Sequence, residues 1–218
     1  MSATVRDVLG TMWTPSEALV AALLSAQARR AIGPAPIEDH IAHALGFLGT
    51  WPELAEADTV LDLGSGGGLP GLVLAARLPK VRFCLLEGSV ERARSLEMAV
   101  RGLGWTGRVT VRGERAEDAA HRPEMRAAFP VVVARGFGPP AATAECAAGF
   151  LRSEGVLVVS GPPGGAPEQW PVGPLGGLGF ELVEVTKSPR SFVILRQVRP
   201  CPGRFPRRVG VPEHRPLF

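Results

Sequence analysis

Short apolar runs alternate with amphipathic stretches along the chain from Thr59 onward. Each apolar run has the length of a buried strand, and the segments between them carry helical periodicity. This alternation predicts a parallel sheet with crossover helices, closed by a strand pair whose last strand runs antiparallel. We expect strands at residues 60–63, 81–86, 109–111, 129–134, 155–160, 180–185 and 192–196, and helices at 69–76, 89–103 and 141–151. The predicted fold is α/β, with a seven-stranded, mostly parallel sheet.

The first 58 residues carry helical periodicity and no strand pattern. Residues 16–32 repeat apolar side chains at helical spacing, a Gly-Pro segment interrupts them, and residues 37–47 resume the pattern. His40 and His43 lie three positions apart on the second helix, and we interpret them as a polar helix edge in preference to a metal-ligand pair. We expect an N-terminal helical cap (1–58), a main domain (59–199) and an extended basic tail (200–218) that packs on or near the active site.

A glycine-rich turn follows the first strand of the main domain. Gly64, Gly66 and Gly68 have the spacing Gly-x-Gly-x-Gly, and a helical pattern begins directly after them. Glycine lets the backbone approach a ligand closely, and the first turn of a helix offers free N–H groups to polar ligand atoms. This succession of strand, turn and helix predicts a cofactor site.

Two carboxylates favour a sulfonium cofactor over a dinucleotide. Asp62 precedes the first glycine by two positions, where it would repel a pyrophosphate and attract the ammonium group of a bound amino acid. Glu87 follows the second strand, where a carboxylate can accept both ribose hydroxyls. S-adenosylmethionine carries both groups, so we expect it as the cofactor. A general nucleotide-binding βα loop is the alternative.

Arg135 directly follows the fourth strand. Ligands of parallel sheets bind outside the carboxyl ends of the strands, so Arg135 and Glu87 should face the same crevice as the glycine turn. We expect Arg135 to act as the catalytic residue by holding the acceptor through a base oxygen or a neighbouring phosphate. A salt bridge at the end of the strand is the alternative role.

Composition narrows the class of protein. A hydrophobic content of 45% with 21% charged residues is typical of a soluble globular chain. The three cysteines are widely spaced and the four histidines are scattered, so we expect neither a disulfide framework nor a metal. No apolar run reaches the length of a membrane helix and no signal peptide is apparent, so we expect a cytoplasmic protein, with a monomer favoured.

Charge is concentrated at the end of the chain. The net charge is +3, and residues 200–218 hold four arginines against one acid, Glu213. Arginine suits phosphate groups, so an anionic partner such as RNA is expected to contact this segment. The candidate RNA contacts are Arg204, Arg207, Arg208 and Arg215.

Several segments come in the same order as in the RsmG (GidB) enzymes, which the chain resembles from Ile37 to Leu217. They are Leu69-Pro70-Gly71, Leu85-Leu86-Glu87 followed by Arg92, Gly113 to Glu117, Val133 to Phe137, and Arg207 to Pro212 with Arg215-Pro216-Leu217. These relatives are class I S-adenosylmethionine-dependent methyltransferases with a Rossmann-like sheet, and they modify guanine N7 in 16S ribosomal RNA of the small subunit. The resemblance implies a cofactor site formed by Asp62, Gly64, Ser65, Gly66, Gly68, Leu69, Pro70, Glu87, Ala116, Glu117 and Arg135.

The chain also departs from the family pattern. The fifth strand ends in Ser160-Gly161, where the family usually carries Lys-Gly. The resemblance implies ribosomal RNA methylation. The missing lysine leaves open a methyltransferase for another RNA or small-molecule acceptor, or a cofactor-binding paralogue without catalysis.

Overall fold

Seven strands form one twisted sheet in the order β5-β4-β3-β6-β7-β9-β8, in which β9 runs in the direction opposite to the other six. The computed structural model describes residues 5–6, 12–162, 166–186 and 190–218. The strands are β3 (Thr59–Leu63), β4 (Arg82–Leu86), β5 (Val109–Arg112), β6 (Phe129–Ala134), β7 (Leu151–Ser160), β8 (Phe180–Val185) and β9 (Phe192–Gln197). The predicted class and strand content are confirmed.

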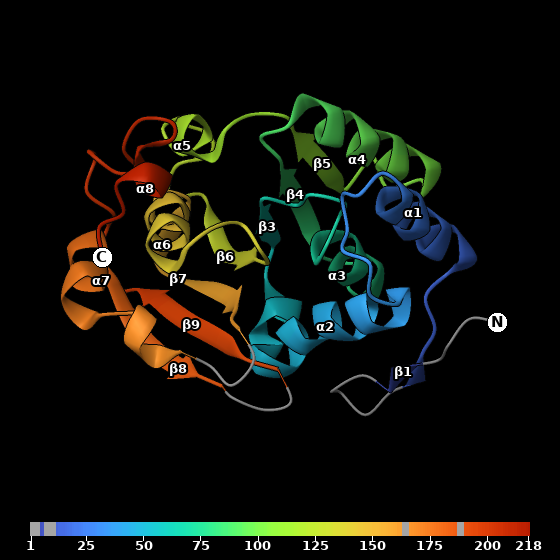
Figure 1. Ribbon diagram of the computed structural model, residues 1–218, viewed down its shortest axis with the longest axis horizontal. Helices are drawn as coiled ribbons and strands as arrows, with labels where there is room; N and C mark the ends of the chain where they lie inside the picture. The colour runs from blue at the N-terminus through green and yellow to red at the C-terminus, as the bar shows by residue number, and fades with distance from the viewer. Residues whose placement is uncertain (1–4, 7–11, 163–165, 187–189) are drawn as a thin grey trace.

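Helices cover both faces of the sheet (Figure 1). One face packs against α1 (Glu17–Ala28), α2 (Ile37–Thr50), α3 (Gly71–Arg77) and α4 (Val90–Gly102). The other packs against α5 (Ala116–Ala119), α6 (Pro140–Ala148) and α7 (Val172–Leu178). Alternate strand residues serve the two layers, so Val60 of β3 lies in the first core and Leu61 and Leu63 lie in the second. Two 3₁₀ turns, Pro52–Glu56 and Pro167–Gln169, and the short helix α8 (Val211–His214) complete these elements.

The N-terminal helices share their core with the sheet. Leu19 and Leu23 of α1 and Ile41 of α2 are buried in the same cluster as Val60 and Phe192 of the strands. The ring of Phe192 meets the ring of Phe47 edge-on, with 4.9 Å between their centroids. These contacts hold the expected cap directly against the sheet, which lets α2 contribute side chains to the site.

Some local expectations were wrong. The first 58 residues are not wholly helical, because β1 (Val5–Arg6) and β2 (Met12–Trp13) pair antiparallel, and two-residue strands are too short to produce a period-2 pattern. The helix expected over 141–151 ends at Ala148, and Leu151 begins β7. Residues 172–178 form α7 despite their glycines, since burial of Leu175 and Leu178 outweighs weak helix propensity.

The register of three neighbouring strands positions the site. Leu63 lies opposite Leu86 on one side and opposite Ala134 on the other. Each of these residues ends its parallel strand, so the next residue of each leaves the sheet at the same edge. Those next residues are Gly64, Glu87 and Arg135.

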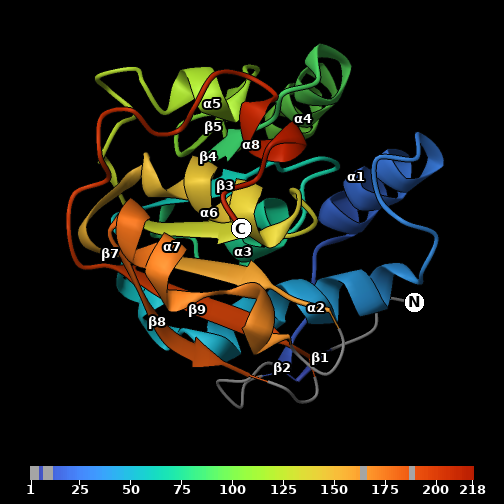
Figure 2. The same ribbon diagram turned by 60° about the vertical axis from the view of Figure 1, so that its left-hand side comes forward.

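The C-terminal segment packs beside α5 and α6, as both Figure 1 and Figure 2 show in red. It is not wholly extended, because it contains α8. Arg126, which lies between α5 and β6, donates hydrogen bonds to the carbonyl oxygens of Cys201, Pro202 and Phe205. A partly buried cluster of hydrogen bonds from one arginine to backbone carbonyls therefore fixes the start of the tail.

Candidate active site

The glycine turn is fixed to the end of the neighbouring strand. The backbone N–H groups of Gly64 and Ser65 both donate to the carbonyl oxygen of Leu86, at 2.9 and 3.0 Å. Gly64 has a φ of 73°, and a Cβ there would lie 2.6 Å from Cδ2 of Phe137. Only glycine satisfies both conditions, so the backbone turns sharply while the ring stays close.

A cavity of about 350 Å³ opens at this turn. Six of the predicted site residues line it: Gly64, Ser65, Gly66, Leu69, Glu87 and Arg135. Its remaining wall includes Phe137 and the Ala31–Gly33 segment, which joins α1 to α2. The N-terminal region therefore closes the site opposite the ends of the strands.

Glu87 is buried and tied to the turn. Its Oε2 accepts a hydrogen bond from the N–H of Gly66 at 2.9 Å. Its Oε1 accepts from the N–H of Ser89 and from the guanidinium of Arg92, whose Nη2 lies 2.8 Å away. A carboxylate has about four acceptor positions, two on each oxygen, so Oε2 keeps one for a ligand.

Asp62 lies behind the turn and does not line the cavity. Its side chain is fully buried, and its Oδ2 accepts from the N–H of Gly71, the first residue of α3, at 2.9 Å. Its Oδ1 has no partner among the described residues. Burial raises the pKa of this carboxyl to about 7, against the opposing effects of the nearby Ser65 hydroxyl and of the hydrogen bond from Gly71.

Gly68 and Pro70 also support the turn from outside the cavity. The N–H of Gly68 donates to the carbonyl oxygen of Ser65 at 2.7 Å, and the Leu69–Pro70 peptide bond is cis. Gly68 has a φ of 99°, a conformation that side chains disfavour. Both residues flank Leu69, which lines the cavity.

Ala116 and Glu117 line a small recess beside the main cavity, with a volume of about 30 Å³. Gly64 and Phe137 belong to the walls of both spaces, so the recess continues the cavity. Glu117 accepts hydrogen bonds from Arg115 and from the N–H of Gly210 in the tail, at 3.1 and 2.9 Å. Burial opposes ionisation of Glu117, but these hydrogen bonds outweigh it and lower the pKa.

Arg135 reaches across to α2. Its Nη2 lies 2.6 Å from Nδ1 of His40, whose Nε2 lies 3.0 Å from the carbonyl oxygen of Gly33. The interpretation of His40 and His43 as a polar helix edge was therefore wrong: His40 is only 6% exposed. His43 stacks on Phe47, and burial lowers its pKa to about 4.

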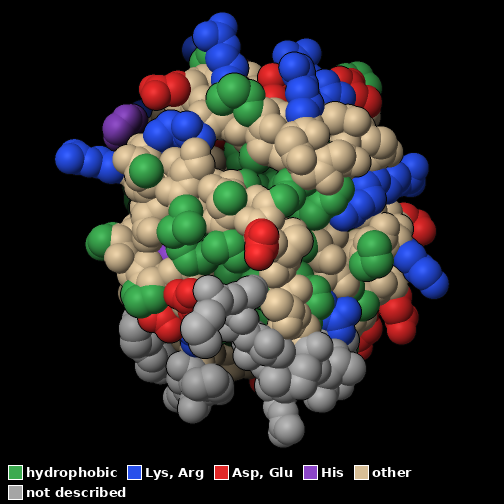
Figure 3. Space-filling model, turned by 90° about the vertical axis from the view of Figure 1, so that its right-hand side faces the viewer, with side chains coloured by type: hydrophobic (Ala, Val, Ile, Leu, Met, Phe, Trp, Pro, Cys, Tyr) green, Lys and Arg blue, Asp and Glu red, His purple; other side chains and the backbone are tan. Residues whose placement is uncertain are grey.

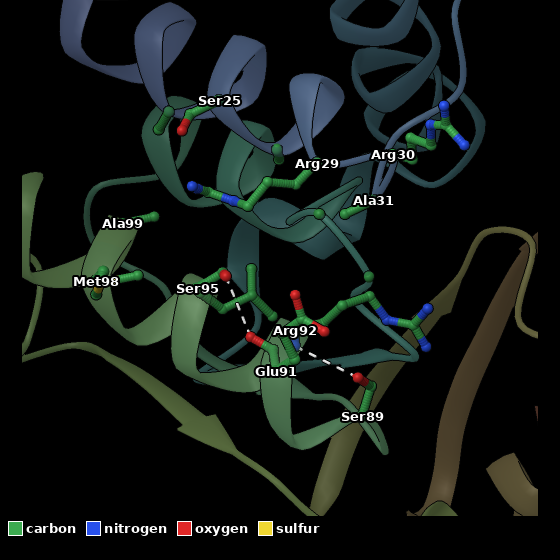
Figure 4. Close-up of a pocket in the computed structure, with 15 residues that line it drawn as sticks. Ser25, Arg29, Arg30, Ala31, Ser89, Glu91, Arg92, Ser95, Met98 and Ala99 are labelled. Carbon is green, nitrogen blue, oxygen red and sulfur yellow. Dashed lines mark hydrogen bonds between the residues drawn. The ribbon is translucent and has the colours of Figure 1, made fainter.

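A second, larger cavity of about 470 Å³ lies between α1 and α4. It adjoins the first, because Gly66, Gly67, Ser89 and Arg92 line both. Figure 3 shows hydrophobic side chains around the hollow on this face of the molecule and basic side chains at its margins. In Figure 4, Arg29 extends from the end of α1 into the space between the helices, whereas Arg30 and Arg92 point to one side. Sequence reasoning did not identify this cavity.

The four tail arginines have different surroundings. Arg207 is bound by Glu145, a fully buried carboxylate on α6, through its N–H and its guanidinium, with Nη2 2.6 Å from Oε2. Arg204 is exposed and lies over the ring of Phe205. Arg208 and Arg215 are exposed. Arg207 therefore holds the tail in place, and the other three present charge to solvent.

Sequence reasoning missed His40, Phe137 and Arg115 as residues of the site. The signal for His40 was its place one turn after Ile37, on the apolar stripe of α2. For Phe137 the sequence held no signal beyond its position two residues after Arg135. The described residues contain no cluster of three potential metal-binding side chains. No helix in the described ranges is long and apolar enough to span a membrane.

The cysteines are not placed for nucleophilic catalysis. Cys84 and Cys146 are buried and Cys201 is partly buried, and all three are free thiols. Burial raises the pKa of Cys84 to about 12 and raises the pKa of Cys146 as well. Thiolates are therefore scarce at neutral pH.

Comparison with known sequences identifies several relatives that carry the same name. The family model described as "rRNA small subunit methyltransferase G" (GidB) matches residues 25–161, more than half of the chain. A protein of that name from Prochlorococcus marinus is 34% identical over 187 residues, which cover 78% of this chain and 75% of the relative. One from Rubrobacter xylanophilus is 36% identical over 75% of this chain and 67% of its own length. One from Parasynechococcus marenigrum is 32% identical, and the match spans 66% of its length, just under two thirds.

Solved structures share the fold at low sequence identity. An O-methyltransferase from Bacillus cereus in complex with SAH has a TM-score of 0.59 and 17% identity, covering 84% of this chain and 91% of that one. The SAH-bound methyltransferase PaMTH1 from Podospora anserina has a TM-score of 0.59 and 15% identity, covering 84% and 88%. The sheet and its helices therefore follow the architecture of methyltransferases.

The raised pKa of Asp62 makes a prediction about stability. A carboxyl whose pKa is higher in the folded state stabilises that state fully below its unfolded pKa, and this contribution is lost as the pH rises through the folded value. Asp62→Asn keeps an acceptor for Gly71 and removes the titration. The variant should gain stability relative to wild type between about pH 4 and pH 7, by as much as about 4 kcal/mol. Urea unfolding of both proteins at several pH values measures this difference, and a difference that stays constant with pH contradicts it.

Proposed function

Because this chain belongs to the rRNA small subunit methyltransferase G family, we propose that it transfers a methyl group from S-adenosylmethionine to N7 of a guanine in small-subunit (16S) ribosomal RNA. The observation that carries the proposal is the meeting of the glycine turn, Glu87 and Arg135 at one cavity. One cavity at this edge of the sheet would then hold the cofactor and the acceptor group side by side.

The residues present fit the proposed cofactor. Glu87 keeps an acceptor position for a ribose hydroxyl, and the small recess at Ala116 and Glu117 extends the cavity on the side proposed for the edge of the adenine. Gly64, Ser65, Gly66 and Leu69 would hold the amino-acid end, and Gly68 and Pro70 maintain the turn. Asp62 acts from behind the turn, where its charge would attract the ammonium group. When bound, the cofactor supplies an electrophilic methyl group.

The proposed acceptor requires little proton chemistry from the protein. Guanine N7 carries a lone pair and no proton, so its methylation needs no general base. The protein's task is then to orient the base and to exclude water. Arg135 is suited to this task, because its Nη1 is buried without a partner among the described residues and can donate to guanine O6 or to a phosphate.

Ribosomal RNA is proposed to contact the tail through Arg204, Arg208 and Arg215, which are exposed. The hydrogen bond from Gly210 to Glu117 brings the tail to the margin of the recess. Arg207, predicted as a fourth RNA contact, instead has Glu145 as its partner. The tail would therefore present phosphate-binding groups from a fixed position beside the cofactor.

Glu87→Gln should weaken S-adenosylmethionine binding about 10- to 100-fold, because a charged acceptor of a hydroxyl becomes neutral. Isothermal titration calorimetry measures the change, and thermal unfolding checks that the turn remains folded. Glu97→Gln is the matched control, since Glu97 is exposed on α4 and lines neither cavity. Equal affinities for wild type and Glu87→Gln would remove Glu87 from the cofactor site.

The acceptor is tested by single-turnover methylation of small-subunit RNA and of assembled subunits, with product nucleosides identified by mass spectrometry. We expect 7-methylguanosine, and with saturating cofactor a chemical rate nearly constant from about pH 6 to pH 9, because no base must titrate. Arg135→Gln should lower this rate with little change in cofactor affinity. A rate that climbs with pH would indicate an acceptor that loses a proton. Failure to methylate either substrate despite cofactor binding would refute the proposed acceptor.

The tail proposal predicts salt-dependent RNA binding. Each of the single substitutions Arg204→Gln, Arg208→Gln and Arg215→Gln should lower the slope of log affinity against log salt by roughly 0.7 to 0.9, and a triple variant combines them. Arg207→Gln should instead lower the melting temperature, since the buried Glu145 carboxylate keeps the backbone N–H of residue 207 but loses its counter-charge. Filter binding across salt concentrations measures the slopes, and thermal unfolding measures the melting temperature. An unchanged slope in the triple variant would exclude the tail from RNA binding.

A further inference from the structure

One histidine joins two parts of the site that are far apart in sequence. His40 lies on α2 and Arg135 follows β6, 95 positions away. The Nη2 atom of Arg135 lies 2.6 Å from Nδ1 of His40, and Nε2 of the same ring lies 3.0 Å from the carbonyl oxygen of Gly33. Both Gly33 and Arg135 line the cavity at the glycine turn. The imidazole therefore connects two walls of the cavity from behind.

The partners determine the form of the imidazole. A guanidinium can only donate hydrogen bonds and a carbonyl oxygen can only accept them. Nδ1 must therefore accept from Arg135, and Nε2 must carry the hydrogen that is donated to Gly33. His40 is thus neutral, in a single tautomer, and both of its nitrogens are engaged. Its ring plane fixes the direction from which the guanidinium approaches.

The two terminal nitrogens of the guanidinium differ in their hydrogen-bond partners. Nη2 is bound to His40, whereas Nη1 is buried and has no partner among the described residues. Nearby His43 makes no hydrogen bond to Arg135: its buried Nε2 has no partner among the described residues, and its ring packs against Phe47 and Phe192. The Gly33 carbonyl is itself held by Nε2 of Gln27, at 2.7 Å. His40 is thus anchored at its far end while it aligns Arg135.

We propose that His40 is a positioning residue, which holds the Arg135 guanidinium in the orientation that presents Nη1 to the acceptor. The inference rests on the proposed function, since it assigns Arg135 to the acceptor side. It makes α2 part of the reaction site through one hydrogen bond and requires no contact between His40 and the substrate.

Two substitutions separate the two hydrogen bonds of the ring. The side-chain amide of Asn lies near the position of Nδ1, and that of Gln lies near the position of Nε2. His40→Asn should keep an acceptor for Arg135, and His40→Gln should keep a donor for Gly33. We expect the single-turnover rate to fall about 10- to 100-fold in His40→Gln and by less than about tenfold in His40→Asn. Cofactor affinity, measured by calorimetry, should change little in both.

The reverse order, with His40→Gln the more active variant, would show that the Gly33 contact matters and would overturn the proposal. Equal activity of both variants and wild type would overturn it as well. A double-mutant cycle adds a second criterion: in an Arg135→Gln background, His40→Gln should cause no further loss of rate. Additive losses would mean that His40 acts independently of Arg135.

A measurement without catalysis separates this inference from the proposed function. Nitrogen-15 NMR of the His40 ring should show a protonated Nε2 and a hydrogen-bonded, unprotonated Nδ1 in wild type. Arg135→Gln should shift the Nδ1 signal and leave the Nε2 signal in place. If these signals appear as expected while no RNA is methylated, the proposed acceptor fails and the hydrogen bond stands. If Nδ1 is protonated in wild type, the positioning role fails whatever the acceptor.

Discussion

The carboxylate of Glu87 is the contact on which the geometry of the site depends. It receives N–H groups from Gly66 in the turn after β3 and from Ser89 at the start of α4, together with the guanidinium of Arg92. The loops after two adjacent strands are thereby tied to one buried charge. Strand register brings the loops to the same edge, and Glu87 fixes the distance between them. A buried carboxylate with several donors is stable only if those donors stay in place, so the site is organised in advance of any ligand.

Much of this arrangement could be predicted because it follows from local pattern. Apolar runs located the seven strands, and the spacing of glycines located the turn, since both depend on neighbouring residues. The rule that parallel strands present their carboxyl ends together then grouped Gly64, Glu87 and Arg135 correctly at one cavity. Family resemblance added Ala116 and Glu117, whose recess no local pattern would have indicated.

The rest could not be predicted because it depends on contacts between distant segments. His40 meets Arg135 only because α2 packs against the sheet through Phe47 and Phe192. Arg207 looked like a phosphate ligand because its partner, Glu145, is 62 positions away on a helix of small buried residues. Asp62 was expected at the cofactor, but alternation along β3 turns its side chain toward Gly71 and the core. In each case the residue type indicated a polar contact, but the partner in that contact is decided by the fold and could not be predicted from neighbouring residues.

The unusual environment of Asp62 also makes the proton a participant in binding. A carboxyl with a pKa of about 7 is partly protonated at neutral pH. Any cation held near that carboxylate competes with the proton, so binding should expel a fraction of one proton into the buffer. The heat of binding would then include the ionisation enthalpy of the buffer, and the apparent affinity would follow pH without any change in shape. A cation bound in the cavity would thus displace a proton from the carboxyl that lies behind the glycine turn.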